Sequence, residues 1–530
     1  MSKTVAWCVP LPSRGAGGFR TILQNARALE LAGYESDFYV ISGDMRGVNQ
    51  DSVRRDMAEW YGYSSARNIY ICPMSLEMDY DLAIATQWDT APFVAVQQCK
   101  NKAYFIQDYE PFFYPMSSRY LAAEATYRLG LTPITIGRWL VNKCRNSDET
   151  TAYHTDFGAN LSVYHPIDQK REHAVCAIYQ PDKPRRASRL LFESISVMQE
   201  LDPSLTIYLF GSNADFPRKD PRVINLGLLS IDELNNLYNR CACGVSFSSS
   251  NPSRIPFEMM AAGLPVVELY GEQTIFDLPQ GPCVLAQPDA ASIATATMNF
   301  VRNKNIREAA SLAGVRFMTN RSLDNEGRQF ADACENITDS ARKTAESMPP
   351  LYLGNPCEAS LESTAAYTQL VLNEQTLRHE SVTPLYLQGN ALTIALANDA
   401  LDLKSAVAAV WSKDDQSDIQ WTNLEKKDDW MEGRVPVPDD FEQFTLAHIH
   451  LYGTNDLAIE PQYIVGIDKP LSKLNQSEDT EIPTHCEVPF SKGSVSLSTC
   501  TIPSSEQTTT TSANKTLAGR VKSFARRIIH

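Results

Sequence analysis

Residues 248–268 read SSSNPSRIPFEMMAAGLPVVE and decide the predicted fold. The apolar run 244–247 before them predicts a buried strand that ends in the polar loop at the start of this stretch. A short helix is expected to begin near Pro256 and to end at Gly263. The apolar run 264–269 then predicts a second buried strand. This succession is typical of a parallel sheet, in which ligands bind at the carboxyl ends of the strands.

Glu258 stands in the first turn of the expected helix. A carboxylate held beside free backbone N–H groups can accept hydrogen bonds from a pair of sugar or ribose hydroxyls while the amides face a phosphate. The segment alone supports equally well a role in which Glu258 only offsets the helix dipole.

The same stretch resembles the nucleotide-binding signature of family-four glycosyltransferases of the GT-B fold. In that signature two glutamates flank the donor, and a run like Ala-Gly-Leu-Pro-Val-Val follows. Glu258 matches the second glutamate, and Ser250 stands where the first is found. The resemblance implies a donor site that contains Glu258, Ser250, Ser253 and Arg254.

The composition limits the class of protein. A chain of 530 residues is long enough for about three domains. Apolar residues make up 43% and charged residues 21%, which is typical of a soluble globular protein. No run reaches the roughly 20 apolar residues of a membrane helix, and the N-terminus lacks the apolar core of a signal peptide. We therefore expect a cytoplasmic location.

Cysteine usage and net charge exclude other classes. The twelve cysteines are scattered, so we expect reduced, mostly buried thiols and no metal site. The net charge of −15 argues against nucleic acid as a partner.

The first strand, 5–10, leads into a glycine-rich loop and a helix that ends at Gly33. This βαβ opening is compatible with a dinucleotide site, a phosphate loop or a sugar-substrate loop. Arg20 replaces the last glycine of a dinucleotide fingerprint, which disfavours that site. The loop also resembles the first loop of the acceptor domain in GT-B enzymes, which implies acceptor binding by Gly17, Gly18 and Arg20.

A predicted strand, 102–106, ends in two carboxylates among four aromatic residues, QDYEPFFY. This composition is typical of a carbohydrate site, although the rings could instead pack in the core. The longer phrase YFIQDYEPFFYP resembles a signature of bacterial surface-glycan rhamnosyltransferases. The resemblance implies catalytic roles for Asp108 and Glu110 and acceptor contacts from Tyr109 and from Trp88.

A second sheet is expected to begin at 174–179, followed by a loop that holds four cations within seven positions. Guanidinium groups at a strand end suit a diphosphate, although a solvated turn is the alternative. The resembling enzymes place phosphate ligands in this loop, and we assign both donor binding and catalysis to Arg185 and Arg186. The resemblance also places Gly227 near the nucleobase, and we expect the helical stretch 305–345 to pack back across the first domain.

Beyond residue 350 the pattern changes to short strands with acidic turns, which predicts an antiparallel β-sandwich over 350–470. Asp414, Asp415 and Asp418 are interpreted as solvated turn carboxylates, with a metal site as the weaker alternative. A flexible linker is expected over 472–514.

The last segment, 515–530, predicts a basic amphipathic helix. Five cations lie mostly off an apolar stripe, which favours binding to a membrane surface over packing in the core. The apolar stripe consists of Leu517, Val521, Phe524 and Ile528.

Together these patterns predict an α/β protein of the GT-B fold, with two facing Rossmann-like domains at 1–165 and 172–345, a sandwich and a tail helix. The resemblance implies a hexosyltransferase that retains configuration and uses dTDP-L-rhamnose as donor without metal or other cofactor. The acceptor would be a growing lipid-linked surface polysaccharide such as O-antigen, assembled with other glycan-assembly enzymes at the inner face of the membrane. The alternative is a non-catalytic glycan-binding or scaffold protein with a degenerate GT-B unit. It is favoured by Ser250, which replaces the first glutamate of the signature, and by Gln180, which stands where the resembling enzymes often have an arginine.

Overall fold

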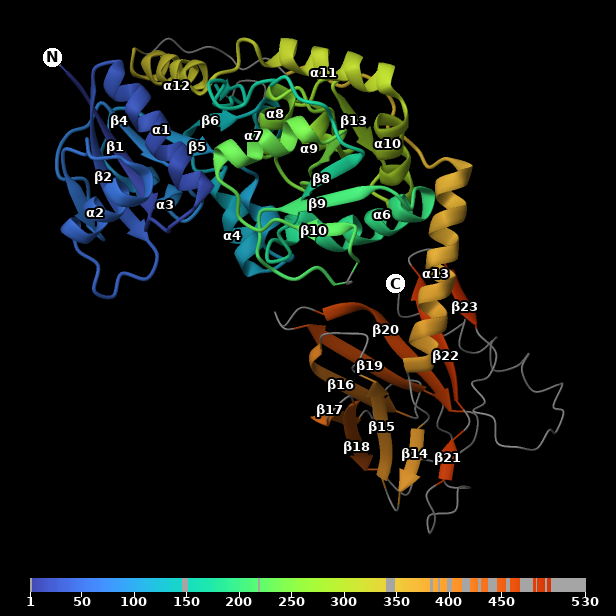
Figure 1. The fold of residues 1–530 in the computed structure, drawn as a ribbon. Helices are drawn as coiled ribbons and strands as arrows, with labels where there is room; N and C mark the ends of the chain where they lie inside the picture. The colour runs from blue at the N-terminus through green and yellow to red at the C-terminus, as the bar shows by residue number, and fades with distance from the viewer. Residues whose placement is uncertain are drawn as a thin grey trace. The chain divides into compact units, whose positions relative to one another are not determined.

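The computed structural model describes residues 2–144, 151–217, 220–339 and 348–381, and beyond these the strands that lie between residues 385 and 496. The chain divides into two compact units, Met1–Tyr367 and Thr368–His530. Unit 1 contains two parallel sheets flanked by helices, and unit 2 contains an antiparallel sheet (Figure 1).

The first sheet of unit 1 has seven parallel strands in the order β3-β2-β1-β4-β5-β6-β7, the doubly wound arrangement of Rossmann-like domains. Its central strands are apolar on both faces because helices cover both faces. The strands are β1 (Lys3–Pro10), β2 (Tyr34–Ser42), β3 (Ile69–Ile71), β4 (Leu82–Ala85), β5 (Lys102–Ile106), β6 (Thr132–Ile136) and β7 (Tyr153–Thr155). The helices are α1 (Gly17–Leu31), α2 (Gln50–Tyr61), α3 (Ala91–Val96), the 3₁₀ helix η1 (Glu110–Phe113), α4 (Ser118–Thr126) and α5 (Arg138–Cys144).

The second sheet has six parallel strands in the order β10-β9-β8-β11-β12-β13. The unit predicted from residues 248–268 is present, because α8 ends before Gly263, whose φ of +74° turns the chain into β12. The strands are β8 (Ala174–Ile178), β9 (Thr206–Phe210), β10 (Val223–Asn225), β11 (Cys243–Val245), β12 (Val266–Leu269) and β13 (Cys283–Ala286). The helices are η2 (Pro184–Arg186), α6 (Ser188–Leu201), α7 (Ile231–Arg240), α8 (Ile255–Ala261), α9 (Glu272–Ile275), α10 (Ala290–Arg302), α11 (Lys304–Met318) and α12 (Leu323–Thr338).

Helix α12 follows the second sheet in sequence but packs against α1 of the first domain (Figure 1). At its end the Lys3 Nζ lies 2.8 Å from the Asp339 Oδ1. The predicted return of the chain across the first domain is therefore confirmed. The expected single helical stretch is divided, since α11 ends at Met318 and α12 begins at Leu323.

Residues 348–367 belong with the second sheet of unit 1. The N–H groups of Leu351 and Tyr352 donate to the Ile275 carbonyl, both at 2.9 Å, and the Cys357 N–H donates to the Leu285 carbonyl at 2.8 Å. Helix α13 (Leu361–Ser381) begins at the end of this segment. The predicted start of the accessory domain at residue 350 is therefore too early, because unit 1 extends to Tyr367 and these residues bond to α9 and to the edge strand β13.

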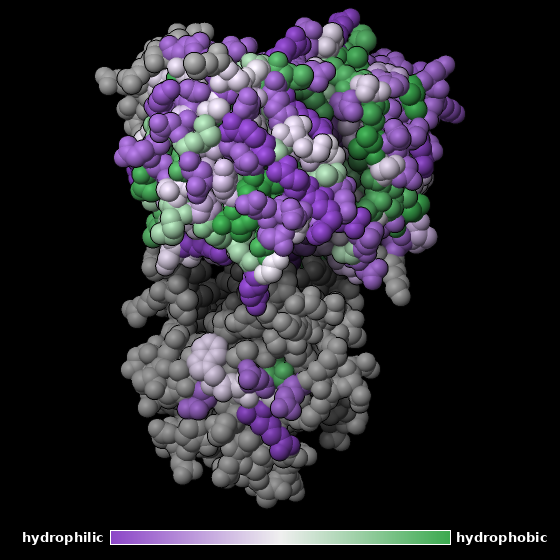
Figure 2. All heavy atoms as spheres, turned by 90° about the vertical axis from the view of Figure 1, so that its left-hand side faces the viewer, coloured by the Kyte–Doolittle hydropathy of each residue, from purple (hydrophilic) through white to green (hydrophobic). Residues whose placement is uncertain are grey.

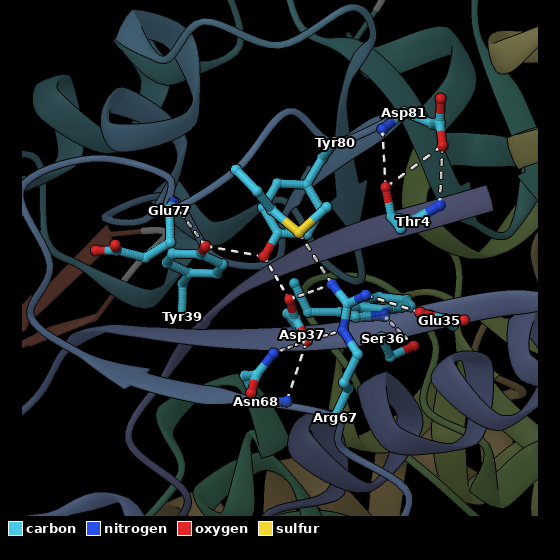
Figure 3. Close-up of polar contacts among 12 residues, drawn as sticks. Thr4, Glu35, Ser36, Asp37, Tyr39, Arg67, Asn68, Glu77, Tyr80 and Asp81 are labelled. Carbon is cyan, nitrogen blue, oxygen red and sulfur yellow. Dashed lines mark hydrogen bonds and ion pairs between the residues drawn. The ribbon is translucent and has the colours of Figure 1, made fainter. Parts of the chain in front are cut away.

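A buried polar cluster connects β2 to the segments before and after β3 in the first domain (Figure 3). The Asp37 carboxylate, fully buried, accepts from the Arg67 Nε at 2.9 Å and the Arg67 Nη2 at 2.6 Å. It also accepts from the Asn68 N–H at 3.0 Å and the Tyr80 hydroxyl at 2.5 Å. Tyr80 in turn pairs with the Tyr39 hydroxyl at 2.9 Å. The cluster satisfies a charge that would otherwise be buried without a partner.

The strands of unit 2 pair in antiparallel fashion, as predicted, and form one hydrogen-bonded series, β21-β14-β15-β18-β17-β16-β19-β20-β22-β23. The packing of two sheets as a sandwich stays a prediction. The acidic turn at 414–418 and the tail 515–530, with Leu517, Val521, Phe524 and Ile528, lie outside the described residues. The strands are β14 (Leu385–Gln388), β15 (Ala391–Ala397), β16 (Leu403–Trp411), β17 (Gln420–Lys427), β18 (Trp430–Pro436), β19 (Leu446–Gly453), β20 (Ala458–Ile467), β21 (Thr480–Ile482), β22 (Thr484–Phe490) and β23 (Gly493–Ser496).

The face of unit 1 drawn in Figure 2 mixes hydrophilic side chains with smaller separate hydrophobic patches. Scattered apolar residues of this kind are usual on a folded protein. None of the helices in the described part of the chain combines the length and the apolar character needed to span a bilayer.

Candidate donor and acceptor site

The carboxyl edges of the two sheets of unit 1 face each other, and Asn251 joins them. Asn251 lies in the loop between β11 and α8, and its Nδ2 donates to the carbonyls of Gln107 at 3.0 Å and Ile136 at 3.2 Å. Both carbonyls follow or end strands of the first sheet. The predicted ligand-binding edges of both domains therefore meet at one place.

Asp108 is inserted from the first domain into a set of hydrogen-bond donors in the second. Its Oδ2 accepts from the Arg185 Nη1 at 2.7 Å and the Ser250 Oγ at 3.0 Å, and its Oδ1 accepts from the Asn251 N–H at 2.9 Å. Burial raises the pKa of Asp108, and Arg185 offsets part of that rise. We call the Arg185 Nη1, the Ser250 Oγ and the Asn251 N–H the anion cradle. The carboxylate predicted to be catalytic is thus not open to a substrate in this arrangement, because each of its oxygens is already hydrogen-bonded.

Glu110, the other carboxylate predicted to be catalytic, is buried beneath the same loop. Its Oε2 accepts from the Trp88 N–H at 2.6 Å and from the Tyr104 hydroxyl at 3.4 Å. Burial raises the pKa of Glu110 to about 8, so this side chain is mostly protonated at neutral pH. Its contacts stabilise the loop after β5, which corrects the expectation that it faces a substrate.

Of the four cations in the loop after β8, two are committed to structural contacts. Arg186 is only 5% exposed, and its Nη1 donates to the Phe247 carbonyl at 3.1 Å and the Ser253 Oγ at 3.2 Å. Burial lowers the pKa of Arg186 to about 10. Arg189 pairs with Glu193 at 3.0 Å along α6. Arg186 therefore supports the loop after β11, which corrects its predicted role as a diphosphate ligand.

Arg185 keeps the position that the sequence predicted for a diphosphate ligand. Its side chain is 30% exposed, and its guanidinium carbon lies 5.3 Å from the centre of the Phe113 ring. It reaches Asp108 with one nitrogen, so the guanidinium retains further N–H groups.

Glu258 is half-buried in the first turn of α8, and no described residue donates a hydrogen bond to its carboxylate. Burial raises its pKa to about 7, while the charges of Arg254 and Arg20 lower it. Arg20 comes from the predicted acceptor loop, so the structure brings a predicted acceptor residue and a predicted donor residue together. An acceptor group of this kind is suited to a pair of hydroxyls.

Arg254, predicted to bind the donor, is engaged in protein contacts instead. Its two terminal nitrogens form a bidentate pair with Glu326 of α12, at 2.5 and 2.6 Å, and also reach the Gly158 carbonyl and the Thr21 Oγ1. It therefore connects α8 with α12 and α1. Gly227 is needed for packing, because a Cβ there would lie 2.3 Å from the Asn213 Oδ1.

The predicted acceptor residues separate into exposed and buried ones. Gly17, Gly18 and Arg20 lie exposed at the start of α1. Tyr109 is buried, with its hydroxyl donating to the Glu124 Oε1 at 3.0 Å, and the Trp88 Nε1 donates to the Tyr114 hydroxyl at 2.9 Å.

The sequence left two interpretations open for the aromatic residues after β5, a carbohydrate site or packing in the core, and different residues fit each one. Tyr109 packs in the core, whereas Phe112 and Phe113 are 42% and 45% exposed. Both exposed rings belong to the 3₁₀ helix η1, and that of Phe113 lies beside Arg185.

Three buried polar residues of the site were missed from the sequence. Asn251 bridges the domains, and Asp277 accepts the Arg138 and Trp139 N–H groups at the start of α5 across the same boundary, at 2.7 and 3.2 Å. Glu268 accepts the Ser248 N–H at 2.9 Å. Burial raises the pKa of Glu268 to about 8. A lone acid within an apolar strand, PVVEL, was the available signal for Glu268, whereas no local pattern indicates Asn251 or Asp277.

Within the described residues, no group of three or more His, Cys, Asp and Glu side chains is placed to hold a metal ion. The cysteines described there are unpaired, as expected for reduced thiols. The expectation that the reaction uses no metal stays a prediction from the sequence.

Comparisons with known proteins follow the same division of unit 1. Residues 73–138 match the model of the WsaF N-terminal domain, and residues 173–297 match that of the WsaF C-terminal domain. The O-antigen biosynthesis protein RfbC of Myxococcus xanthus is 27% identical over 328 residues, which cover 58% of this chain and 25% of that protein. The match thus spans about a quarter of the length of this relative.

Among solved structures, TarM aligns with a TM-score of 0.51 at 9% identity, covering 64% of this chain and 99% of that chain. Anabaena HepE in complex with UDP and glucose aligns with a TM-score of 0.47 at 10% identity, covering 64% and 100%. The TarM likeness concerns the fold alone. The two WsaF domain matches and the RfbC match confirm that this chain resembles the family-four-like glycosyltransferases of bacterial surface glycans, and the TarM likeness agrees with their GT-B fold.

Proposed function

We propose that this chain is a glycosyltransferase that transfers a sugar from a nucleotide-sugar donor to a growing bacterial surface glycan. The observation that carries the proposal is the meeting of the two sheet edges around Glu258 and Arg185. Glu258 offers a carboxylate without a hydrogen-bond donor among the described residues, and Arg185, in the loop after β8 of the same sheet, offers guanidinium N–H groups. A hydrogen-bond acceptor for hydroxyls and a hydrogen-bond donor for phosphate on one sheet suit a nucleotide sugar.

The proposed chemistry follows from the charge that develops during transfer. When the bond from the sugar to the diphosphate breaks, negative charge accumulates on the leaving phosphate oxygen. Arg185 stabilises that charge, and groups preorganised in this way contribute about 3–4 kcal/mol to lowering a barrier. Glu258 holds sugar or ribose hydroxyls and so fixes the donor's orientation.

The finer features of the proposal come from the resemblance. The donor is dTDP-L-rhamnose, the transferred sugar retains its configuration, and no metal or other cofactor takes part. The match to RfbC, an O-antigen biosynthesis protein, agrees with a role in surface-glycan assembly. The acceptor is a lipid-linked glycan that lies against the first domain, near Gly17, Gly18 and the exposed rings of Phe112 and Phe113.

The proposed place of action is the inner face of the cell membrane, alongside other glycan-assembly enzymes. This proposal depends on the basic amphipathic pattern of residues 515–530. The antiparallel strands of unit 2, proposed to form a sandwich, would recognise or position the acceptor.

The test is an incubation of the purified full chain with a panel of nucleotide sugars, dTDP-L-rhamnose included, and a short rhamnoside on a lipid-like carrier. Mass spectrometry should detect a product that is larger by one sugar, and the Glu258→Gln variant should form much less of it. If the chain binds the rhamnoside but transfers no sugar from any donor, the alternative of a non-catalytic glycan-binding protein is correct.

A further inference from the structure

The anion cradle belongs to the second domain, but the carboxylate that fills it comes from the first. Three donors of the second domain converge on Asp108: a guanidinium N–H of Arg185 at 2.7 Å, the Ser250 hydroxyl at 3.0 Å and the Asn251 N–H at 2.9 Å. A fourth, the Tyr109 N–H at 2.8 Å, belongs to the same loop as Asp108. A cation, a hydroxyl and a backbone amide directed at one point bind any oxyanion of suitable size. The cradle therefore does not by itself distinguish a carboxylate from a phosphate.

The framework that shapes the cradle does not include Asp108. The Ser249 N–H donates to the Arg185 carbonyl at 2.9 Å, which connects the two loops that supply the donors. Arg186 supports the same loop through the Phe247 carbonyl, and Glu268 accepts the Ser248 N–H. These contacts lie wholly within the second domain, and none of them involves Asp108.

The proposed donor presents a diphosphate to Arg185, the same side chain that Asp108 occupies. Asp108 and a phosphate cannot both accept from the Arg185 Nη1, the Ser250 Oγ and the Asn251 N–H at these distances, and their like charges repel each other. One anion must displace the other.

We propose that the anion cradle binds a phosphate group of the donor and that Asp108 is its intramolecular competitor, which occupies the cradle while the donor is absent. This inference rests on the proposed function. It implies that donor binding displaces the Asp108 carboxylate from the cradle. Donor binding and the contact of Asp108 with the cradle are then linked, and each weakens the other by the same factor.

The test is the binding of inorganic pyrophosphate, dTDP and thymidine to the full-length Asp108→Asn variant, measured by titration calorimetry. Removal of the competing carboxylate should tighten pyrophosphate and dTDP binding at least about five-fold, a coupling within the usual range. Thymidine lacks phosphate, so its affinity should stay the same.

Two control variants separate competition from other effects. Asp89→Asn removes a carboxylate whose charge raises the pKa of Glu110. Asp89 is not one of the residues that form or occupy the anion cradle. Asp277→Asn weakens another contact between the domains that involves no cation. Both should leave pyrophosphate affinity within about two-fold of the wild type, since neither occupies the cradle.

The inference is overturned if Asp108→Asn binds pyrophosphate no more tightly than the wild type, or if Asp89→Asn gains as much. Circular dichroism shows whether the Asp108→Asn variant is folded. If it is not, the Asp108→Ser variant takes its place in the same titrations. If pyrophosphate binding tightens while no form binds dTDP, the inference holds and the proposed donor nucleotide is wrong.

Discussion

Glu258 and Arg186 are both charged, both lie at the carboxyl edge of the second sheet, and both were predicted to bind the donor. Their surroundings assign them different roles. Arg186 donates to Phe247 and Ser253 within the protein, whereas the Glu258 carboxylate has no hydrogen-bond donor among the described residues. A buried polar group is usually satisfied by the protein unless a ligand satisfies it. Glu258 is therefore the better candidate for a donor contact.

Replacing Glu258 by Gln should weaken nucleotide-sugar binding by about 1.5–3 kcal/mol, because a charged hydrogen-bond acceptor is lost. The effect should depend on pH. Burial raises the pKa of Glu258 to about 7, and the ionised form is the better acceptor. Donor affinity of the wild type should therefore increase as pH rises through about 7. Titration calorimetry on both sides of that pH tests this, and the Gln variant should show no such increase. A pH profile shared by both proteins would exclude Glu258 from the donor site.

Asp37 is a buried carboxylate whose hydrogen-bond partners all belong to the protein, and these partners determine its pKa and its contribution to stability (Figure 3). Burial alone would raise the pKa of Asp37, but the Arg67 and Tyr80 hydrogen bonds hold it below its ordinary value. Because the folded pKa is depressed, the stabilisation is fully present above the unfolded pKa of about 3.9. It is lost as pH falls through the folded pKa.

Asp37→Asn should lower the free energy of unfolding by about 2–3 kcal/mol at neutral pH, and less below about pH 4. Urea unfolding at several pH values measures this. Asp44 forms a comparable pair with Arg46 on the surface, where solvent screens the charges, so Asp44→Asn should leave the urea midpoint unchanged. Equal effects from the two variants would show that burial does not decide the strength of the pair.

At the scale of elements, two segments determine where unit 1 ends. Helix α12 packs on α1, and the Arg254–Glu326 pair fastens it to α8. Residues 348–367 then bond to the end of α9 through Leu351 and Tyr352 and to the edge strand β13 through Cys357. Since these residues bury side chains such as Tyr352, unit 1 needs them for its core.

A fragment of residues 1–381 should therefore be more stable than a fragment of residues 1–345. Loss of the Tyr352 side chain alone removes roughly 1.5–3 kcal/mol of apolar burial, so the shorter fragment should melt at least about 2 °C lower. Differential scanning fluorimetry compares the two. Tyr352→Ala in the longer fragment is the matched control and should lower its melting temperature in the same direction. Identical melting temperatures for both fragments would place the boundary near residue 345 after all.

At the scale of the whole molecule, an acidic chain carries a basic last segment. Residues 515–530 contain five cations and no acid within a chain of net charge −15. Four large apolar side chains offer roughly 6–12 kcal/mol of gross burial at a membrane surface, and each cation adds about 1 kcal/mol near anionic lipid. A membrane-bound segment would keep the enzyme near lipid-linked acceptors.

Flotation with anionic liposomes compares the full chain with a form that ends at Asn514. We expect only the full chain to float with the vesicles, and high salt to weaken its binding because the electrostatic part is screened. Neutral vesicles serve as the control for charge. If both forms float equally, or neither does, the segment is not a membrane anchor.

The local features of this protein follow from its sequence. Alternation of apolar runs with glycine-rich and polar loops specifies parallel strands and helices, since each strand must be apolar on two covered faces and each turn needs particular residues. The succession from Ser246 through Glu258 to Leu269, the aromatic loop after β5 and the cations after β8 were all visible in this way. The antiparallel pairing in unit 2 was predicted on the same grounds.

Which charged residues are available to a ligand was decided only by the tertiary structure. Arg185 and Arg186 are neighbours with the same side chain, yet one is buried under the loop after β11 and the other reaches Asp108 across the domain boundary. The partner of each residue lies more than sixty positions away in the sequence. Burial and hydrogen bonding depend on such distant contacts, whereas sequence patterns report only on neighbours along a strand or helix.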